Sequence, residues 1–363
     1  MGTVGIPNCP DAVTAEWLAE VLAGSGHRVA VEAVEVQPIG TGQTGATYRI
    51  DVRYGSWHRA DGADLPNSFV IKLPAQDPAV RDRVALSYRS EHAFYTGVAD
   101  TVAVPLPRCY FCAYAEPADF ALLLADMAPA EQGDQIRGCT IAEAQAAVTA
   151  LAGLHGPRWC DPAWLSFEGT VMPKPDQAAA HGLGEITRMA AATTIERVGE
   201  RLTATDCATV LQSADLIADW LLGAGDRFSI LHGDYRADNV LFDPQGGRAT
   251  VVDWQTLAVG LPARDLAYFL GTSLQPAVRV RHERTLLQVY REALNGFGVA
   301  DFDDETCWHD YRFGMLQIPM ITTLGFAFSA ATDRGDDMVV AMLERGSRAI
   351  RDLGTLELVR SGG

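Results

Sequence analysis

Side chains that carry oxygen atoms follow one another closely around residue 240. Asp234 and Asn239 lie five positions apart, and Asp253 ends the next apolar run along the chain. Transfer of a phosphoryl group needs a carboxylate that orients the attacking hydroxyl or accepts its proton, a metal ion that holds the phosphates, and a fixed cation. Carboxylate and amide oxygens are the ligands that magnesium takes from proteins. These residue types in this order indicate phosphoryl-transfer chemistry.

A small hairpin is predicted to bring two of these residues together. The apolar runs 240–242 and 249–252 flank the turn at 244–247, which is the pattern of two short paired strands. Asn239 precedes the first run and Asp253 follows the second. Because a hairpin places these two positions at the same end, both side chains can reach one magnesium ion.

A glycine-rich loop lies nearer the N-terminus. Gly40, Gly42 and Gly45 separate two runs of alternating apolar and polar residues within 33–56, and this alternation predicts two strands. The pattern G-x-G-x-x-G marks a dinucleotide site when a helix follows it, but here a strand follows. The loop is therefore predicted to be the tip of a hairpin, either a loop that covers a nucleotide or a plain turn.

One lysine and one glutamate are placed to form an inward ion pair. Lys72 is the single charge of a short apolar strand at 68–74, and a helix is predicted from about Arg81 to Val98. Glu91 shares the apolar face of this helix with Tyr88. A carboxylate turned inward needs a partner, because its desolvation costs several kcal/mol. Lys72 is the nearest candidate in the sequence, although taken singly it is also compatible with a surface lysine.

These motifs resemble those of the aminoglycoside phosphotransferase and choline-kinase superfamily, with the ecdysteroid-kinase-like branch close by. His232-Gly-Asp234-x4-Asn239 is similar to the catalytic signature, and Asp253-Trp-Gln stands where protein kinases have Asp-Phe-Gly. The resemblance runs from the glycine loop to the helices beyond Asp265. It implies that Asp234 is the catalytic base, that Asn239 and Asp253 bind magnesium, and that Asp265 supports the catalytic loop. We expect His232 to bond backbone groups near the loop.

The resemblance also implies the fold, the domains and the cofactors. We expect an α+β, bilobal protein-kinase-like fold, with a nucleotide-binding lobe at 1–127 and a mostly helical lobe at 128–363. The first lobe has a small antiparallel sheet and one main helix, and the second carries the catalytic loop and the acceptor pocket. ATP and Mg²⁺ are the implied cofactors, with Lys72 and Glu91 orienting the phosphates. Further nucleotide contacts are expected at Gly40, Gly42, Gly45, Asp126 and Met127.

The acceptor is expected to be a hydroxyl group of a small molecule. Only a short segment separates Asp253 from Asp265, so an activation loop of the protein-kinase type does not fit. The stretch 308–328 is rich in aromatic and apolar residues, which favours an apolar hydroxyl compound over an aminoglycoside or amino alcohol. The alternative is that this stretch is only core. A nucleotide-binding pseudokinase is the competing function, but Lys72 and the three oxygen-bearing residues are all present.

Composition excludes several other classes. The formal net charge of −17 without a basic stripe argues against nucleic-acid binding. Seven scattered cysteines predict reduced thiols in the cytoplasm, and the pair Cys109 and Cys112 has zinc spacing but no second pair of ligands. The uncharged stretch 313–332 is long enough to span a bilayer, but its polar residues and Pro319 favour a buried, kinked helix over a membrane span. No feature of the sequence specifies an oligomeric state.

Overall fold

The computed structural model describes residues 4–39, 45–55, 65–328 and 332–362. The chain divides into two compact units, the first comprising 1–99 with 106–128 and the second 100–105 with 129–363. The predicted division after residue 127 assigned the segment 100–105 to the N-terminal lobe. This segment joins the second unit through backbone hydrogen bonds: Ala103 donates to Gly153, and Pro105 accepts from Val251.

The first unit is built on a five-stranded antiparallel sheet, in which the strand order is β1-β2-β3-β5-β4. The strands are β1 (Val31–Pro38), β2 (Gly45–Tyr54), β3 (Ser68–Pro74), β4 (Cys109–Ala115) and β5 (Asp119–Ala125). Successive side chains of a strand point to opposite faces. The period-two alternation read from the sequence is therefore confirmed in β2, and β3 places Ile71 and Lys72 on different faces.

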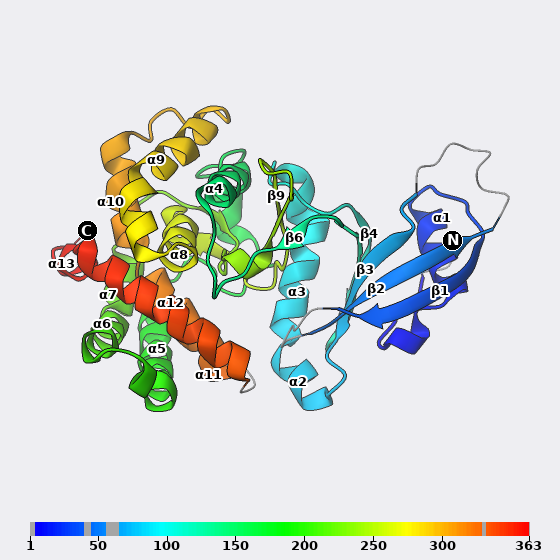
Figure 1. Cartoon of the computed structure of the whole chain (residues 1–363), viewed down its shortest axis with the longest axis horizontal. Coiled ribbons are helices and arrows are strands. Elements are labelled where there is room, and N and C mark those ends of the chain that lie inside the picture. Colours follow the sequence, from blue (N-terminus) through cyan, green and yellow to red (C-terminus); the bar gives the residue numbers. More distant parts are fainter. Residues whose placement is uncertain (1–3, 40–44, 56–64, 329–331, 363) are drawn as a thin grey trace. The chain divides into compact units, whose positions relative to one another are not determined.

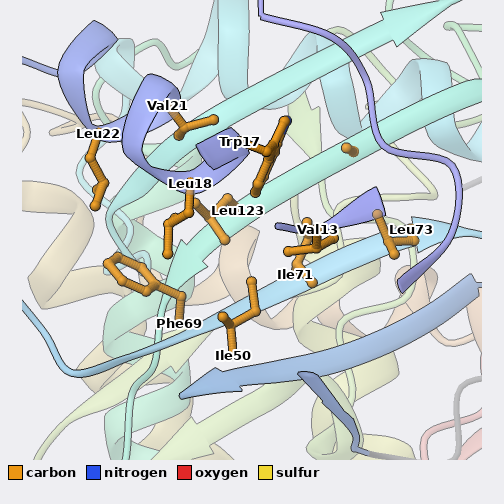
Figure 2. Packing of buried hydrophobic residues seen from close by; sticks show 11 residues of the cluster. Val13, Trp17, Leu18, Val21, Leu22, Ile50, Phe69, Ile71, Leu73 and Leu123 are labelled. Atoms are coloured by element: carbon orange, nitrogen blue, oxygen red, sulfur yellow. The ribbon is translucent and has the colours of Figure 1, made fainter. Parts of the chain in front are cut away.

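Helices cover both faces of this sheet (Figure 1). Figure 2 shows one face, where Leu18 and Val21 of α1 (Ala15–Gly24) belong to one buried cluster with Phe69 and Ile71 of β3. On the other face, Tyr88 of α3 (Ala85–Ala93) stacks on Phe120 at a ring-centroid distance of 5.2 Å. The sequence had predicted one main helix for this lobe, and α1 is an additional one that seals the second apolar face.

The helix predicted from Arg81 to Val98 is divided into three pieces. A first helix, α2 (Pro78–Arg83), is capped by Asp77 and has proline in its first turn, where the missing N–H is tolerated. The backbone leaves the helical conformation at Val84, and α3 then begins at Ala85. A turn of π-helix at Phe94–Val98 continues α3.

The second unit is mostly helical. Its helices are α4 (Ile141–His155), α5 (Gln177–Val198), α6 (Ala204–Asp215), α7 (Ile217–Leu222), α8 (Ala263–Ser273), α9 (Pro276–Asn295), α10 (Asp304–Gly314), α11 (Gln317–Phe328), α12 (Asp333–Asp352) and α13 (Thr355–Arg360). Its strands are β6 (Glu131–Gln132), β7 (Ser229–Leu231), β8 (Val240–Phe242), β9 (Ala249–Val251) and β10 (Ala258–Gly260). The predicted capping box opens α4, with reciprocal hydrogen bonds between Thr140 and Glu143. The fold class is α+β, as predicted.

The uncharged stretch near the C-terminus forms parts of two helices instead of one kinked helix. The first, α10, ends at Gly314, and α11 begins at Gln317. Pro319 lies in the first turn of α11, where a proline leaves the hydrogen-bond ladder intact, so it causes no kink. Among the residues that the structure describes, no helix combines the length and the apolarity needed to cross a membrane.

Candidate active site

The predicted hairpin is formed by β8 and β9 and places two candidate ligands side by side. Val240 pairs with Val251, and the next ladder bond runs from the Val252 N–H to the Asn239 carbonyl at 3.0 Å. Asn239 and Asp253 therefore flank the same end of the hairpin. Asp253 has a φ of 71°, in the left-handed region that residues other than glycine adopt infrequently. Such backbone strain is concentrated at functional sites.

The carboxylate of Asp234 is held by three donors. Oδ1 accepts a hydrogen bond from the Tyr268 hydroxyl at 2.8 Å. Oδ2 accepts from Arg236 Nε at 3.0 Å and from Asn239 Nδ2 at 3.1 Å. Burial acts to lower the pKa of Arg236, but the neighbouring carboxylates, foremost that of Asp234, raise it, so the guanidinium stays charged. The Asp234 side chain is 20% exposed, which leaves it accessible from one side.

The amide of Asn239 is oriented by the same loop. It lies at the end of a short 3-10 turn, and Nδ2 donates to the Asp234 carbonyl at 2.8 Å as well as to the carboxylate. Since the amide nitrogen is committed to Asp234, the carbonyl oxygen is the atom that can bind a cation. This is the donor that magnesium prefers, and it lies at the same hairpin end as Asp253.

His232 has the structural role expected of it. Its ring is buried, Nε2 lies 3.0 Å from the Val252 carbonyl, and Nδ1 lies 3.3 Å from the Asp234 N–H. A carbonyl can only accept and an N–H can only donate, so Nε2 carries the proton and Nδ1 is the acceptor. The histidine thus ties the loop to the end of β9, and both of its nitrogens face backbone.

A buried carboxylate on α8 fixes the backbone of the loop. Asp265 accepts from the His232 N–H at 2.7 Å and from the Gly233 N–H at 3.0 Å, and it is fully buried. Gly233 has a φ of 83°, and a Cβ there would lie 2.0 Å from the Thr256 carbonyl oxygen, so only glycine fits. These contacts between Asp265 and the backbone of residues 232–233 form a brace for the loop. His155, at the end of α4, faces this brace, because its Nε2 lies 3.4 Å from Asp265.

The same brace includes two residues that the sequence did not single out. Gln317 Nε2, at the start of α11, donates to the Gly233 carbonyl at 2.9 Å. The Tyr290 hydroxyl lies 2.7 Å from Nδ1 of His155. Neither residue belongs to a short motif, and both become recognisable only when helices distant in sequence meet at the loop.

In the first unit, the ion pair expected between Lys72 and Glu91 is present. Lys72 Nζ lies 2.6 Å from Glu91 Oε1, the glutamate is fully buried, and the lysine side chain is 16% exposed. The lysine comes from the centre of β3 and the glutamate from α3, which covers that face of the sheet. This geometry satisfies a buried carboxylate and leaves the lysine in a defined position.

The other residues predicted to contact the nucleotide lie in different structural environments. Gly40 and Gly42 lie outside the described residues, and Gly45 is the first residue of β2. Met127 is half-buried. Asp126 accepts hydrogen bonds from Ser68 Oγ, from the Ala128 N–H and from Arg49 Nη2, and it also forms an ion pair with Arg49, whose Nε lies 2.8 Å from the carboxylate. Partial burial acts to raise the pKa of Asp126, but these hydrogen bonds and the Arg49 charge together lower it.

Cys109 and Cys112 do not form part of a metal site in the described part of the chain. No group of three or more histidine, cysteine or acidic side chains there could hold a metal ion. Burial raises the pKa of the Cys112 thiol far above its usual value, so the thiolate that zinc requires is disfavoured.

The stretch proposed to line an acceptor pocket is largely core in α10. Tyr311 and Phe313 are buried, and the Tyr311 hydroxyl donates to Glu283 Oε2 at 3.0 Å. The carboxylate of Asp310 is bound by Arg227 through two contacts of 2.6 and 2.7 Å. In α11, by contrast, Ile321 and Leu324 remain partly exposed. The side chain of Phe328 lies outside the described residues.

Solved structures with the same fold include two kinases. The microcompartment-associated aminopropanol kinase is 16% identical, over 90% of this chain and 94% of that one, with a TM-score of 0.52. The ethanolamine kinase of Plasmodium vivax is 12% identical, over 99% of this chain and 92% of that one, with a TM-score of 0.51. These likenesses confirm the predicted kinase-like fold.

Curated relatives match a short part of the chain. Acyl-CoA dehydrogenase family member 11 of Gallus gallus is 37% identical over 65 residues, and the human protein of the same name is 34% identical over 58 residues. These matches span 18% and 15% of this chain, and 8% and 7% of the relatives' lengths. The sequence model described as the Phosphotransferase enzyme family matches residues 35–297, which is most of the chain. The chain therefore belongs to the phosphotransferase enzyme family.

Proposed function

We propose that this protein transfers the γ-phosphoryl group of ATP to a hydroxyl group of a small molecule, with Asp234 as the catalytic base. The observation that carries the proposal is the carboxylate of Asp234, which is fixed by three donors and lies beside Asn239 at the end of the β8–β9 hairpin. A carboxylate fixed in this way can orient an attacking hydroxyl and accept its proton.

Asn239 and Asp253 are the proposed magnesium ligands. Their donor set fits the ion, since magnesium is usually held by one or two protein oxygens together with substrate phosphates. When bound, magnesium neutralises the charge that builds up on the phosphate oxygens. The chain's contribution is to present the Asn239 amide oxygen and the Asp253 carboxylate from two adjacent strand ends, one of them in a strained backbone conformation.

Lys72 is the proposed cation for the nucleotide phosphates, and Glu91 holds it in place. The 2.6 Å contact with a fully buried carboxylate restricts the lysine to a narrow set of rotamers. Contacts of the nucleotide with Gly40, Gly42 and Gly45 stay predictions, as do contacts with Asp126 and Met127. The side chain of Asp126 is engaged within its own unit.

We favour a neutral or largely apolar hydroxyl compound as the acceptor. The half-exposed residues Ile321 and Leu324 lie on α11, whose first residue, Gln317, binds the catalytic loop. Asp310 is paired with Arg227, so it is not available to an ammonium group. The relatives named for acyl-CoA dehydrogenation give a reason to include hydroxyacyl compounds among the candidates. Assignment to the ecdysteroid-kinase-like branch stays a prediction, with an aminoglycoside or amino alcohol as the alternative acceptor.

ADP release over a panel of acceptors tests the proposal. The panel contains kanamycin, ethanolamine, glucose, ecdysone and 3-hydroxydecanoyl-CoA, with water alone as the blank. Asp234→Asn is expected to lower turnover by several orders of magnitude while ATP affinity changes little. Asp243→Asn, at the other end of the same hairpin, is the matched control and should retain activity.

Calorimetric titration with ATP separates the enzyme from a pseudokinase. Binding is expected to need Mg²⁺, and Asp253→Ala should remove that dependence together with activity. Tight binding of ATP without turnover in the wild type would instead favour a nucleotide-binding regulator. Robust turnover of kanamycin, with none of ecdysone or the hydroxyacyl compound, would reverse the preference for an apolar acceptor.

A further inference from the structure

Helix α8 presents two side chains to the catalytic loop from one face. Asp265 and Tyr268 are three positions apart, a spacing that puts both on the same side of a helix. Asp265 binds the backbone N–H groups of His232 and Gly233, and the Tyr268 hydroxyl donates to Asp234 Oδ1 at 2.8 Å. The helix thus fixes the backbone before Asp234 with one residue and its carboxylate with the other.

Tyr268 is built to act as a hydrogen-bond donor. Its side chain is 1% exposed, so the ring is held by packing on all sides. Burial first, and then the negative charge of Asp234, raise the pKa of the Tyr268 phenol well above its usual value. The hydroxyl therefore keeps its proton at neutral pH and donates a hydrogen bond to the carboxylate.

The hydrogen bonds of Asp234 leave one direction open. A carboxylate offers about four lone-pair directions, two on each oxygen. Within the described part of the chain, Oδ2 accepts from both Arg236 and Asn239, whereas Oδ1 accepts from Tyr268 alone. The remaining direction is on Oδ1, next to the phenol of Tyr268.

We propose that Tyr268 is a positioning residue, which holds the Asp234 carboxylate so that Oδ1 receives the hydroxyl of the acceptor. This inference rests on the proposed phosphotransferase function. The acceptor O–H donates to Oδ1 while its oxygen forms a bond to the γ-phosphorus. The bond from that phosphorus to the bridging oxygen breaks, its electron pair leaves with ADP, and the hydroxyl proton passes to Oδ1.

Loss of the Tyr268 hydroxyl has a specific consequence. In Tyr268→Phe, Oδ1 has two open directions, and the carboxylate is tied through Oδ2 alone. The acceptor hydroxyl is then no longer confined to one approach, and a misplacement of about 1 Å costs roughly 100-fold in rate. We expect kcat to fall about 10- to 100-fold, with the KM for ATP within about twofold of the wild type, because Tyr268 acts on the acceptor side.

A double-mutant cycle tests whether Tyr268 acts through Asp234. The probe is the compound of the panel that gives the fastest ADP release, or water if none exceeds the blank. The wild type, Tyr268→Phe, Asp234→Asn and the double variant are compared. Tyr268→Phe should lower kcat in the wild-type background and cause no further loss in the Asp234→Asn background. An equal fold loss in both backgrounds, or an unchanged kcat in Tyr268→Phe, would overturn the inference.

Tyr311→Phe is the matched control. It removes the same hydroxyl from a buried phenol that also donates to a carboxylate, Glu283 Oε2, and it should keep wild-type kcat. Thermal unfolding of Tyr268→Phe and Tyr311→Phe shows whether a loss in kcat is caused by a loss of stability. If the wild type releases no ADP that depends on Asp234, the proposed function itself fails. If the wild type is active and Tyr268→Phe matches it, only the inference about Tyr268 fails.

Discussion

Asp265 is the residue whose replacement tests most directly how the proposed catalytic loop, residues 232–239, is held. It is fully buried, and it accepts the N–H groups of His232 and Gly233 at 2.7 and 3.0 Å. Asp265→Ala leaves both N–H groups buried without an acceptor. Asp265→Asn keeps one carbonyl oxygen but turns an NH₂ group toward the second N–H, so one hydrogen bond is lost and the shape is kept.

The magnitudes follow from the number of lost bonds. A buried donor left without a partner costs about 1–3 kcal/mol. We therefore expect Asp265→Asn to lower the free energy of unfolding by about 2 kcal/mol and Asp265→Ala by about 4 kcal/mol. For a unit of this size, 1 kcal/mol corresponds to roughly 2–4 °C in Tm, so the asparagine variant should unfold roughly 4–8 °C earlier.

Thermal unfolding and steady-state kinetics measure the two consequences. Because the backbone beside Asp234 shifts when the brace is weakened, kcat should fall about 100-fold or more in Asp265→Asn, while the KM for ATP stays within about twofold. The control is Asp303→Asn. Asp303 caps α10 through the Thr306 N–H at 2.8 Å, and asparagine caps a helix as well as aspartate, so this variant should change Tm very little.

Two outcomes would refute this reasoning about Asp265. If Asp265→Asn had the same Tm as Asp303→Asn, its two hydrogen bonds would not stabilise the fold. If Asp265→Asn lost stability but kept its kcat, the carboxylate would support the fold without placing the catalytic loop.

Three further predictions concern the first unit. Lys72→Met removes the cation that pairs with the buried Glu91 and should lower the free energy of unfolding by about 3–5 kcal/mol, measured by thermal unfolding. Adding Glu91→Gln should recover most of this loss. If the losses of the two single variants instead add up in the double variant, the two residues do not act as a pair. Because the pKa of Asp126 is lowered in the folded state, its contribution to stability is full above the unfolded pKa of about 3.9 and is lost as the pH falls through the folded value. The drop in Tm below pH 4 should therefore be smaller in Asp126→Asn than in the wild type, and equal drops would contradict this. Leu18→Ala, at a fully buried position of α1, should lower the free energy of unfolding by about 2–5 kcal/mol, and an unchanged Tm would show that α1 does not brace the sheet.

Local patterns in the sequence were sufficient for several elements. Alternating residues predicted β2, the capping box predicted the start of α4, and two apolar runs around a turn predicted the β8–β9 hairpin. These features depend on residues only a few positions apart, so the local sequence is enough to predict them. The ion pair of Lys72 and Glu91 was also predictable, because an inward carboxylate on a helix after a strand demands a nearby cation.

Other elements escaped prediction because their reasons are not local. Helix α1 was not foreseen, since its apolar face has meaning only against the strands that it covers. The predicted kink at Pro319 is wrong, because α10 ends at Gly314 and the proline lies in the first turn of a new helix, α11. Nε2 of His155 lies 3.4 Å from a carboxylate on α8, far along the chain.

The sequence by itself determined which residues are the candidates for phosphoryl transfer, because Asp234, Asn239 and Asp253 lie on one loop and one hairpin within a short span. Only the tertiary structure decided how the carboxylate of Asp234 is held. Tyr268 reaches it from α8, across more than thirty residues of chain, at 2.8 Å. A buried hydrogen bond depends on which helices pack against each other, and short-range spacing does not contain that information.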